Sequence, residues 1–334
     1  MSGNSRRAIG LALQEGRAGE AERLALDWLE TSPDDRGVRQ ILAAALLEQQ
    51  RFDDAAEAAL ALTAAAPEDT DAAVLLVRTL YRGERYDEAR QAVARGLSQD
   101  PGDARLLQLL RAVDEALDRR ALFASLPYLA AYRTWMDRSV RRDPQAAVGS
   151  LWEELGQLQF DYLCASGLSP SDRLLDLGCG TLRAGRHFIR WLEPGHYAGL
   201  EMSGAALDHA RRLVAEEGLS DRAPLLVQNP SGALDFAELD GRRFDAVLAQ
   251  SVFTHLHEDH FEQCFAHLDG VLAEGGRFFF TFNEAAETER WSEKDFAYPF
   301  ALFSDIAGAH GFAVERRGDY RHPRGQVMAI AARR

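Results

Sequence analysis

Two carboxylates and a run of glycines follow two apolar stretches in the second half of the chain. The stretch LLDLGCGTLRAG, residues 174–185, runs from apolar residues into Asp176, Gly178 and Gly180. This pattern is typical of a buried strand whose glycine turn opens a helix, where backbone N–H groups face a nucleotide-like ligand. Glu201 ends the next apolar stretch, HYAGLE, at a place where a carboxylate can accept hydrogen bonds from both hydroxyls of a ribose.

The spacing of the glycines argues against ligands that carry phosphates. A dinucleotide site needs the pattern GxGxxG, but the third glycine comes too late here, and no GK[ST] follows as it would in a P-loop. Asp176 stands two residues before the first glycine, where its charge would repel a pyrophosphate and attract an ammonium or a sulfonium group. Together with Glu201, it predicts a nucleoside that bears an amino acid and no phosphate.

Strands and helices alternate around these residues, which indicates a doubly wound α/β sheet with its ligand outside the carboxyl ends of the strands. Apolar runs predict strands at 173–178, 196–201, 224–228, 244–250, 276–283, 311–318 and 325–333. Amphipathic runs predict helices at 183–192, 203–218 and 258–272.

Four motifs in this order resemble those of the class I S-adenosylmethionine-dependent methyltransferases, over residues 150–334. They are LLDLGCGTLRAG, YAGLEMS, FDAVLAQSVFTHL and VLAEGGRFFFTF; in the last one, Ala273 and Glu274 replace the usual Lys-Pro. The resemblance implies a Rossmann-like sheet of seven strands in the order 3-2-1-4-5-7-6, with residues 325–333 as the antiparallel strand. It also implies S-adenosylmethionine as the cofactor.

The resemblance also assigns residues to the cofactor. Asp176, Gly178 and Gly180, with Cys179 between the glycines, are expected at the methionine end, and Glu201 at the ribose. Arg183 is either a partner of the cofactor carboxylate or a solvated helix residue. The remaining candidates are Asn229 or Asp235 for the adenine amino group, Phe236 for an apolar wall, and Gln250 and Ser251 for the methionine and its methyl group.

Methyl transfer to a hydroxyl or a protonated amine also needs a base. His255 follows the fourth strand and His322 precedes the last one, so both are catalytic candidates. His255 alternatively packs the next helix, and His322, with Tyr320 and Gln326, is structural or faces the substrate. No HExxH spacing occurs near His255, and no metal is predicted. The tentative substrate residues are Trp152, Asn283, Trp291 and Tyr298, which alternatively serve packing.

The first third of the chain is repetitive. Pro33, Pro67 and Pro101 are 34 residues apart, and Ala21, Ala55 and Ala89 keep the same step. A 34-residue period with a terminal proline resembles the tetratricopeptide repeat, a pair of antiparallel helices that stacks on its neighbours. Three repeats and a capping helix at 103–120 predict an all-α solenoid at 1–120. Such a solenoid either binds a polypeptide or mediates dimerisation or scaffolding.

A helical connector is expected at 121–149, rich in Tyr and Trp, with a break at 141–150. Ser150 and Glu153 have the spacing of a capping box, which predicts a helix that starts at Ser150 and ends near Gly167. Within this helix, Trp152, Gln157 and Gln159 either line the mouth of the following domain or pack on its sheet.

The composition of the chain limits the classes of partner that it can be expected to bind. The 334 residues carry a net charge of −14, so free nucleic acid and anionic membranes are poor default partners. The three cysteines are far apart and the N-terminus has no signal-peptide pattern, which favours a reducing, cytoplasmic location. A single lysine among many arginines and alanines hints at a GC-rich, bacterial genome.

The sequence therefore predicts a methyltransferase that acts on an O or N nucleophile of a peptide, protein or small molecule. A noncatalytic interaction protein that keeps a vestigial nucleotide-binding domain is the main alternative, although the retained Asp176 and Glu201 argue against it. An NAD-dependent enzyme is a second alternative.

Overall fold

The computed structural model describes residues 2–334, with side chains from residue 6 onward. It divides into two compact units, one that ends at Ala121 and one that spans Leu122–Arg334. In the part of the chain described, none of the helices is both long and apolar enough to cross a membrane.

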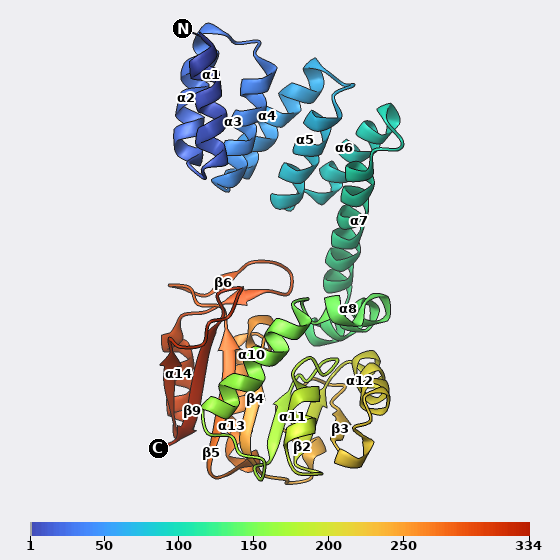
Figure 1. Cartoon of the computed structure of the whole chain (residues 1–334), viewed down its shortest axis with the longest axis vertical. Helices are drawn as coiled ribbons and strands as arrows, with labels where there is room; N and C mark the ends of the chain where they lie inside the picture. Colours follow the sequence, from blue (N-terminus) through green and yellow to red (C-terminus); the bar gives the residue numbers. More distant parts are fainter. Residues whose placement is uncertain (1) are drawn as a thin grey trace. The chain divides into compact units, whose positions relative to one another are not determined.

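Seven helices build the first unit, and the six that precede the last one pack in sequence order (Figure 1). The seventh helix, α7, runs past Ala121. Their bounds are Ser2–Gln14 (α1), Ala18–Thr31 (α2), Arg36–Glu48 (α3), Phe52–Ala65 (α4), Thr70–Arg82 (α5), Tyr86–Gln99 (α6) and Ala104–Ser125 (α7).

The 34-residue period reappears in the contacts of this unit. The three alanines Ala21, Ala55 and Ala89 are completely buried, so that neighbouring helices approach closely. Asp35 and Asp69 accept hydrogen bonds from backbone N–H groups at the starts of α3 and α5, which stabilises each helix N-terminus. The predicted three pairs and one further helix are thus confirmed.

The second unit contains a seven-stranded sheet in the order β3-β2-β1-β4-β5-β9-β8. In order of appearance this is the predicted 3-2-1-4-5-7-6, and β9 is antiparallel to both of its neighbours, as expected. The strands are Leu174–Leu177 (β1), Tyr197–Glu201 (β2), Leu225–Gln228 (β3), Phe244–Ala249 (β4), Leu272–Phe282 (β5), Phe312–Arg317 (β8) and Val327–Arg333 (β9).

Alternating side chains give this sheet two cores. On β5, Phe278 and Phe280 pack with one apolar cluster, which includes helices α13 and α14, whereas Phe279 packs with the other, which includes α10, α11 and α12. Figure 1 shows α10 and α11 crossing one face of the sheet. These helices are Trp152–Ala165 (α10), Gly185–Trp191 (α11), Gly204–Glu216 (α12), Glu258–Val271 (α13) and Phe300–Ala309 (α14).

Smaller elements complete the unit. Two helices precede α10, a two-stranded hairpin follows β5, and three short 3-10 helices occupy loops. Their bounds are Tyr128–Arg142 (α8), Pro144–Ala147 (α9), Glu289–Arg290 (β6), Phe296–Ala297 (β7), Ser220–Arg222 (η1), Ala237–Leu239 (η2) and Phe253–His255 (η3).

Residues 122–149, predicted as a connector, lie within the second unit. Asp137 on α8 accepts hydrogen bonds from the Ser203 hydroxyl and the Ala205 N–H, which fastens α8 to the turn after β2. The division at residue 149 stays a prediction.

The prediction of a capping box at the start of α10 is wrong. Ser150 and Leu151 both have left-handed backbones, with φ of 53° and 50°, so that α10 begins only at Trp152 and has no side-chain cap. Glu153 instead forms an ion pair with Arg186. The strained turn has a consequence for the site, because it brings the preceding residues over the glycine loop.

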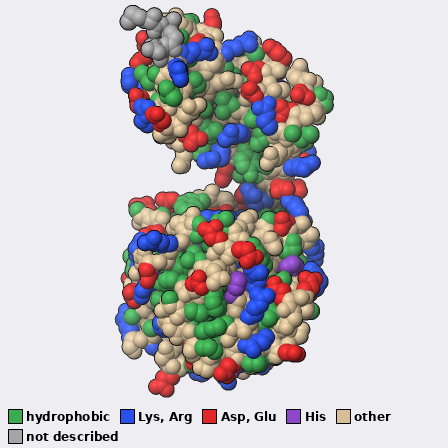
Figure 2. Space-filling model, viewed as in Figure 1, with side chains coloured by type: hydrophobic (Ala, Val, Ile, Leu, Met, Phe, Trp, Pro, Cys, Tyr) green, Lys and Arg blue, Asp and Glu red, His purple; other side chains and the backbone are tan. Residues whose placement is uncertain are grey.

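Charges of both signs are interspersed on the surface. Figure 2 shows acidic and basic side chains next to one another on the visible face of each unit. Many of them form ion pairs, such as Arg85 with Glu88 and Arg316 with Glu284.

Candidate functional site

A cavity of about 610 Å³ opens in the second unit where β1, β2 and β4 end. The carboxyl ends of parallel strands form its floor, which is the usual ligand position in such a sheet. Helix α8, residues 146–149 and the β6–β7 hairpin contribute to its walls. Of the residues predicted from the sequence, it is lined by Asp176, Gly178, Cys179, Gly180, Arg183, Glu201, Asn229, Gln250, Ser251, His255, Asn283, Trp291 and His322, and also by Gln159 and Gln326.

The glycine loop at this floor requires glycine. Gly178 and Gly180 have φ of +72° and +56°, which other residues rarely adopt. A Cβ at Gly178 would lie 2.6 Å from Cγ2 of Val252, and one at Gly180 would lie 2.9 Å from Cγ1 of Val148. The loop is therefore held between the end of β4 and the segment before α10.

Glu201 is buried and only partly satisfied by the protein. Its Oε2 accepts from the Gly180 N–H at 3.0 Å, and its Oε1 accepts from the Ser203 N–H at 2.8 Å. Burial raises the pKa of Glu201, and these backbone hydrogen bonds oppose that shift. Because a carboxylate offers about four lone-pair positions, Glu201 can still accept two further hydrogen bonds from a ligand in the cavity.

Asp176 is also buried, and it accepts a hydrogen bond from the Tyr197 hydroxyl at 2.7 Å. Burial raises the pKa of Asp176 to about 7, although the hydrogen bond from Tyr197 lowers it. The ionised carboxylate is thus costly in the protein alone, and a cationic ligand group would stabilise it.

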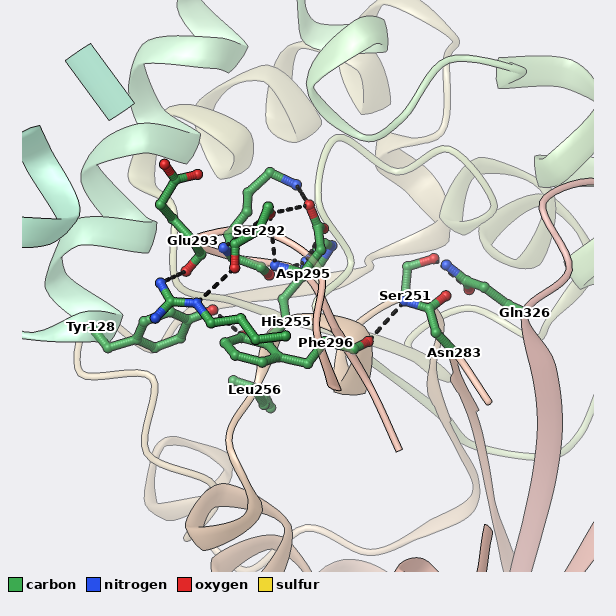
Figure 3. Close-up of polar contacts among 12 residues, drawn as sticks. Tyr128, Ser251, His255, Leu256, Asn283, Ser292, Glu293, Asp295, Phe296 and Gln326 are labelled. Carbon is green, nitrogen blue, oxygen red and sulfur yellow. Dashed lines mark hydrogen bonds and ion pairs between the residues drawn. The ribbon is translucent and has the colours of Figure 1, made fainter. Parts of the chain in front are cut away.

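His255 lies beside an acid that the sequence did not indicate. Its Nδ1 is 2.8 Å from the carbonyl oxygen of Lys294 and 3.1 Å from Oδ1 of Asp295, and Figure 3 shows the two side chains facing each other. Both partners are acceptors, so Nδ1 carries the proton and Nε2 of the neutral ring keeps its lone pair. Within the described chain, Nε2 has no hydrogen-bond partner.

The groups around Asp295 stabilise its negative charge. Burial raises its pKa, but the hydrogen bond from His255 and the ammonium of Lys294 outweigh burial and hold the pKa well below its ordinary value. Lys294 donates to both oxygens of Asp295, at 2.8 and 3.0 Å, and its ammonium lies 4.9 Å from the ring centre of Trp135. Asp295 therefore stays ionised beside His255.

His322 has the opposite surroundings. Its Nδ1 accepts from the backbone N–H groups of Arg324 and Gln326, at 3.2 and 3.4 Å. The proton must then reside on Nε2, which is buried and has no partner in the described residues. Burial and the charges of Arg183 and Arg324 lower the pKa of His322 to about 4, so the ring is neutral at ordinary pH.

A polar network joins the end of β4 to β9. Oε1 of Gln326 accepts from Gln250 Nε2, Ser251 Oγ and Thr281 Oγ1, at 3.0, 2.9 and 2.9 Å. Figure 3 shows Ser251 and Gln326 next to each other. The Tyr320 hydroxyl donates to Oε1 of Gln250 at 2.7 Å. These contacts fix the two predicted residues Gln250 and Ser251 at the cavity wall.

Six of the residues named as candidates from the sequence do not line the cavity, and two of these are Gln157 and Tyr320. Asp235 is exposed and accepts a hydrogen bond from the Ala237 N–H, while Phe236 and Tyr298 are buried in the core. Trp152 packs under the guanidinium of Arg186, whose Cζ lies 5.5 Å from the centre of the Trp152 ring. For the substrate set, only Asn283 and Trp291 remain at the cavity.

Asn229 lines the cavity, but its amide is used within its own turn. It donates to the carbonyl of Ala233 and accepts from Ser231 Oγ and the Gly232 N–H. Its neighbour Leu234 contributes an apolar side chain to the cavity instead. The adenine contact therefore remains a prediction.

Among the cavity residues that the sequence did not indicate are Tyr132, Trp135, Lys294 and Asp295. A signal existed for the first two, because Tyr128, Tyr132 and Trp135 follow helical spacing and form one aromatic face of α8. The hairpin residues carried no comparable pattern. Among the described residues, no cluster of three or more side chains could bind a metal ion.

Comparison with known proteins agrees with this geometry. Residues 174–276 match the family model of the methyltransferase domain, and residues 54–113 match that of the tetratricopeptide repeat. The second unit is a class I methyltransferase domain, and the first carries tetratricopeptide repeats. The cofactor of this class is S-adenosylmethionine.

Similar solved structures include other methyltransferases. The CcbJ methyltransferase from Streptomyces caelestis is 17% identical, with a TM-score of 0.43, over 53% of this chain and 89% of that one. Magnesium protoporphyrin IX methyltransferase from Synechocystis PCC 6803, with bound cofactor, is 16% identical, with a TM-score of 0.48, over 63% and 99%. The glycopeptide N-methyltransferase MtfA is 16% identical, with a TM-score of 0.44, over 54% and 94%.

Proposed function

We propose that this methyltransferase transfers a methyl group from S-adenosylmethionine to a hydroxyl or amine of its acceptor, with His255 as the general base. The observation that carries this proposal is the hydrogen bonding of His255. Its Nδ1 faces Lys294 O and Asp295, which leaves Nε2 as a proton acceptor at the cavity wall. A base in this position serves nucleophiles that must lose a proton as they attack.

The residues at the floor of the cavity fit the cofactor. Glu201 has free lone pairs for two ribose hydroxyls, and the raised pKa of Asp176 favours a ligand with a cationic amino group. When bound, S-adenosylmethionine supplies an activated methyl group on a sulfonium leaving group. The network of Gln250, Ser251 and Gln326 would orient the reacting groups through side chains that are already fixed.

Asp295 then acts through His255. It orients the ring by accepting from Nδ1, and its negative charge stabilises the imidazolium that forms when Nε2 takes the proton of the acceptor. Trp135 of α8 and Lys294 of the β6–β7 hairpin line the cavity beside this pair, which restricts water around it.

The acceptor side of the cavity favours a planar group. Tyr132, Trp135 and Trp291 line it, and the ring of Tyr132 is 5.3 Å from that of His255. Aromatic faces of this kind stack on flat ligands. The acceptor is thus either a small molecule with a ring or a side chain of a polypeptide.

The repeats of the first unit would recruit a polypeptide acceptor or pair two chains. Leu26 and Leu60, at the same position of successive repeats, are 49% and 53% exposed. These two exposed leucines favour a protein partner on this surface. Light scattering on the full chain would separate the two roles. A dimer would favour pairing of two chains, and a monomer would favour recruitment of a polypeptide acceptor.

Calorimetry with S-adenosylhomocysteine tests the proposed function. The full chain should bind it with micromolar affinity, and Glu201→Ala should weaken binding about a hundredfold, because two hydrogen bonds to a carboxylate are lost. The matched control is Glu216→Ala, an exposed residue of α12, which should leave the affinity unchanged. Absence of binding, or equal affinity in Glu201→Ala, would contradict the proposal.

A further inference from the structure

A groove of about 460 Å³ lies on the repeat unit, between α4 and α6. Helix α5 packs against both of these helices and supplies Leu76 and Leu80 to the floor of the groove, beside Ala56 of α4. The polar and charged residues of the walls are Asp53, Glu57, Arg85, Glu88, Gln91 and Arg95. Leu60 of α4 also lines the groove and is 53% exposed. The repeats thus combine an apolar hole with an apolar side chain at its edge.

One position of the 34-residue period explains why the groove is open here. Glu22, Ala56 and Arg90 occupy this position in successive repeats. Glu22 forms an ion pair with Arg51 of the next repeat at 2.5 Å, and Arg90 forms one with Asp114 of α7 at 2.9 Å. Long side chains therefore occupy the two equivalent sites, whereas the methyl group of Ala56 leaves the site between α4 and α6 open.

The charges at this groove are paired within the chain only in part. Arg85 forms ion pairs with Asp53 at 3.2 Å and with Glu88 at 2.7 Å, so these three charges already have partners. Glu57 on α4 and Arg95 on α6 are exposed, and neither forms an ion pair with a residue that the structure describes. The wall of the groove thus offers one unpaired acid and one unpaired base.

A surface that holds both halves of each contact fits a second copy of itself. Leu60 is an apolar side chain next to an apolar hole, and the acid Glu57 lies on the same groove as the base Arg95. In a twofold dimer every complementary pair forms twice, because residue i contacts residue j of the other chain and j contacts i. A partner of one charge sign would leave Glu57 or Arg95 unpaired.

The directions of the helices permit this pairing. Helices α4 and α6 run in the same direction, because α5 reverses the chain between them. A twofold axis along the groove therefore places α4 of one copy over α6 of the other. Glu57 then lies over Gln91, its counterpart 34 residues later, and Arg95 follows Gln91 by one helical turn, which long side chains can span.

We propose that two copies of this chain pair through the groove between α4 and α6, with Leu60 of each copy seated in the groove of the other. The inference rests on the proposed role of the repeats as a binding surface, and it selects self-association from the two roles given above. It is independent of the cofactor and of the methyl transfer proposed for the second unit.

Sedimentation equilibrium of the full chain tests the pairing. The wild type should be dimeric at about 50 µM and dissociate on dilution. Leu60→Glu should raise the dissociation constant of the dimer at least about a hundredfold, because two buried leucines are replaced by two charges at once. Leu60 is half exposed in the single chain, so the circular dichroism of this variant should match that of the wild type.

Leu26→Glu is the matched control. Leu26 has the same position in the preceding repeat and is 49% exposed, but the ion pair of Glu22 with Arg51 occupies the equivalent site there. This variant should therefore keep the dissociation constant of the wild type.

An exchange of the two unpaired charges tests the twofold arrangement. Glu57→Arg alone and Arg95→Glu alone should each weaken the dimer about tenfold, because like charges then face each other twice. The double variant restores opposite charges across the interface and should return the dissociation constant to within about threefold of the wild-type value.

A wild type that is monomeric at this concentration would overturn the inference and leave the groove to another polypeptide. A dimer that Leu60→Glu does not weaken, or that Leu26→Glu weakens equally, would overturn it too. Lack of recovery in the double variant would overturn the placement of α4 over α6. The affinity for S-adenosylhomocysteine is measured separately, so failure of the pairing is distinct from failure of the proposed function.

Discussion

His255 and His322 line the same cavity, follow or precede strands of the same sheet, and yet have opposite hydrogen-bonding partners. Nδ1 of His255 meets two acceptors, the carbonyl of Lys294 and the carboxylate of Asp295. Nδ1 of His322 meets two donors, the N–H groups of Arg324 and Gln326. Consequently the first ring turns a lone pair towards the ligand, and the second turns an N–H towards it.

The neighbouring backbone, rather than the residue type, therefore decides whether each histidine accepts or donates a proton. On the His255 side, the β6–β7 hairpin supplies a carbonyl and an acid. On the His322 side, the turn before β9 supplies amide groups, and the nearby charges are those of Arg183 and Arg324. One side can take up a proton, and the other can only hold an anion.

Of the variants considered, Asp295→Asn should lower the rate of methyl transfer most. The amide can donate to Nδ1 and so favour the wrong tautomer of His255, and the charge that stabilises the imidazolium is lost. We expect methyl transfer to fall by about 10²- to 10⁴-fold, while the affinity for S-adenosylhomocysteine stays within about twofold. Transfer of labelled methyl groups from the cofactor would measure the first quantity, and calorimetry the second.

The matched control for this variant is Asp305→Asn, an exposed position on α14, which should retain full activity. Long-range ¹H–¹⁵N spectra of the imidazoles give a readout that needs no acceptor. They should show His255 protonated at Nδ1 and His322 at Nε2 in the wild type, with only His255 altered in Asp295→Asn. An unchanged transfer rate would remove Asp295 from the mechanism.

Local patterns predicted the framework of this site well. The strands and the positions of Asp176 and Glu201 followed from apolar runs that end in glycine or acid, because these features are encoded within a few residues. The order of the strands followed only from the resemblance of four motifs to those of the class I methyltransferases. The turn after β3 was harder, since Asn229 folds its loop back by hydrogen bonds that no spacing reveals. Phe236 consequently lies in the core instead of at the cavity.

The pair of His255 and Asp295 was beyond such reasoning for a physical reason. The two residues are 40 positions apart and meet only because a hairpin after β5 folds back over η3. The opposite tautomers depend on single backbone groups, which a sequence pattern does not locate. Helix α8 was predicted as a connector, although its aromatic spacing already indicated a buried face.

Asp176→Asn should remove a cost that the burial of Asp176 imposes on folding. Burial raises the pKa of Asp176 from 3.8 to about 7, so the folded protein pays for its ionisation as the pH rises between these values. The asparagine variant should therefore be more stable above pH 7, by on the order of a few kcal/mol, and gain little near pH 4, where the folded carboxyl is protonated. Thermal melts at pH 4, 6 and 8 would follow this difference.

The same variant should bind S-adenosylhomocysteine more weakly, because the partner of its ammonium loses its charge. Asp208→Asn, an exposed residue on α12, is the control, and it should show neither effect. A stability gain that is equal at all three pH values would mean that packing, and not ionisation, separates the variant from the wild type.

Lys294→Met should have the smallest effect on the rate of methyl transfer. Lys294 touches the reaction only through Asp295, to which it donates twice, so its loss should lower methyl transfer by about threefold to tenfold and leave the His255 tautomer in place. Lys294→Arg, which keeps the charge, should recover part of the rate.

Because Lys294 is the only lysine, amine-reactive labelling followed by mass spectrometry reports on this side chain and, besides it, only on the N-terminus. Labelling of the wild type should be slow if Asp295 and Trp135 hold the ammonium. If Lys294→Met instead loses as much activity as Asp295→Asn, the ammonium itself must face the reacting groups. The His255 side would then hold a charged acceptor, and the two sides would differ only in the tautomers of their histidines.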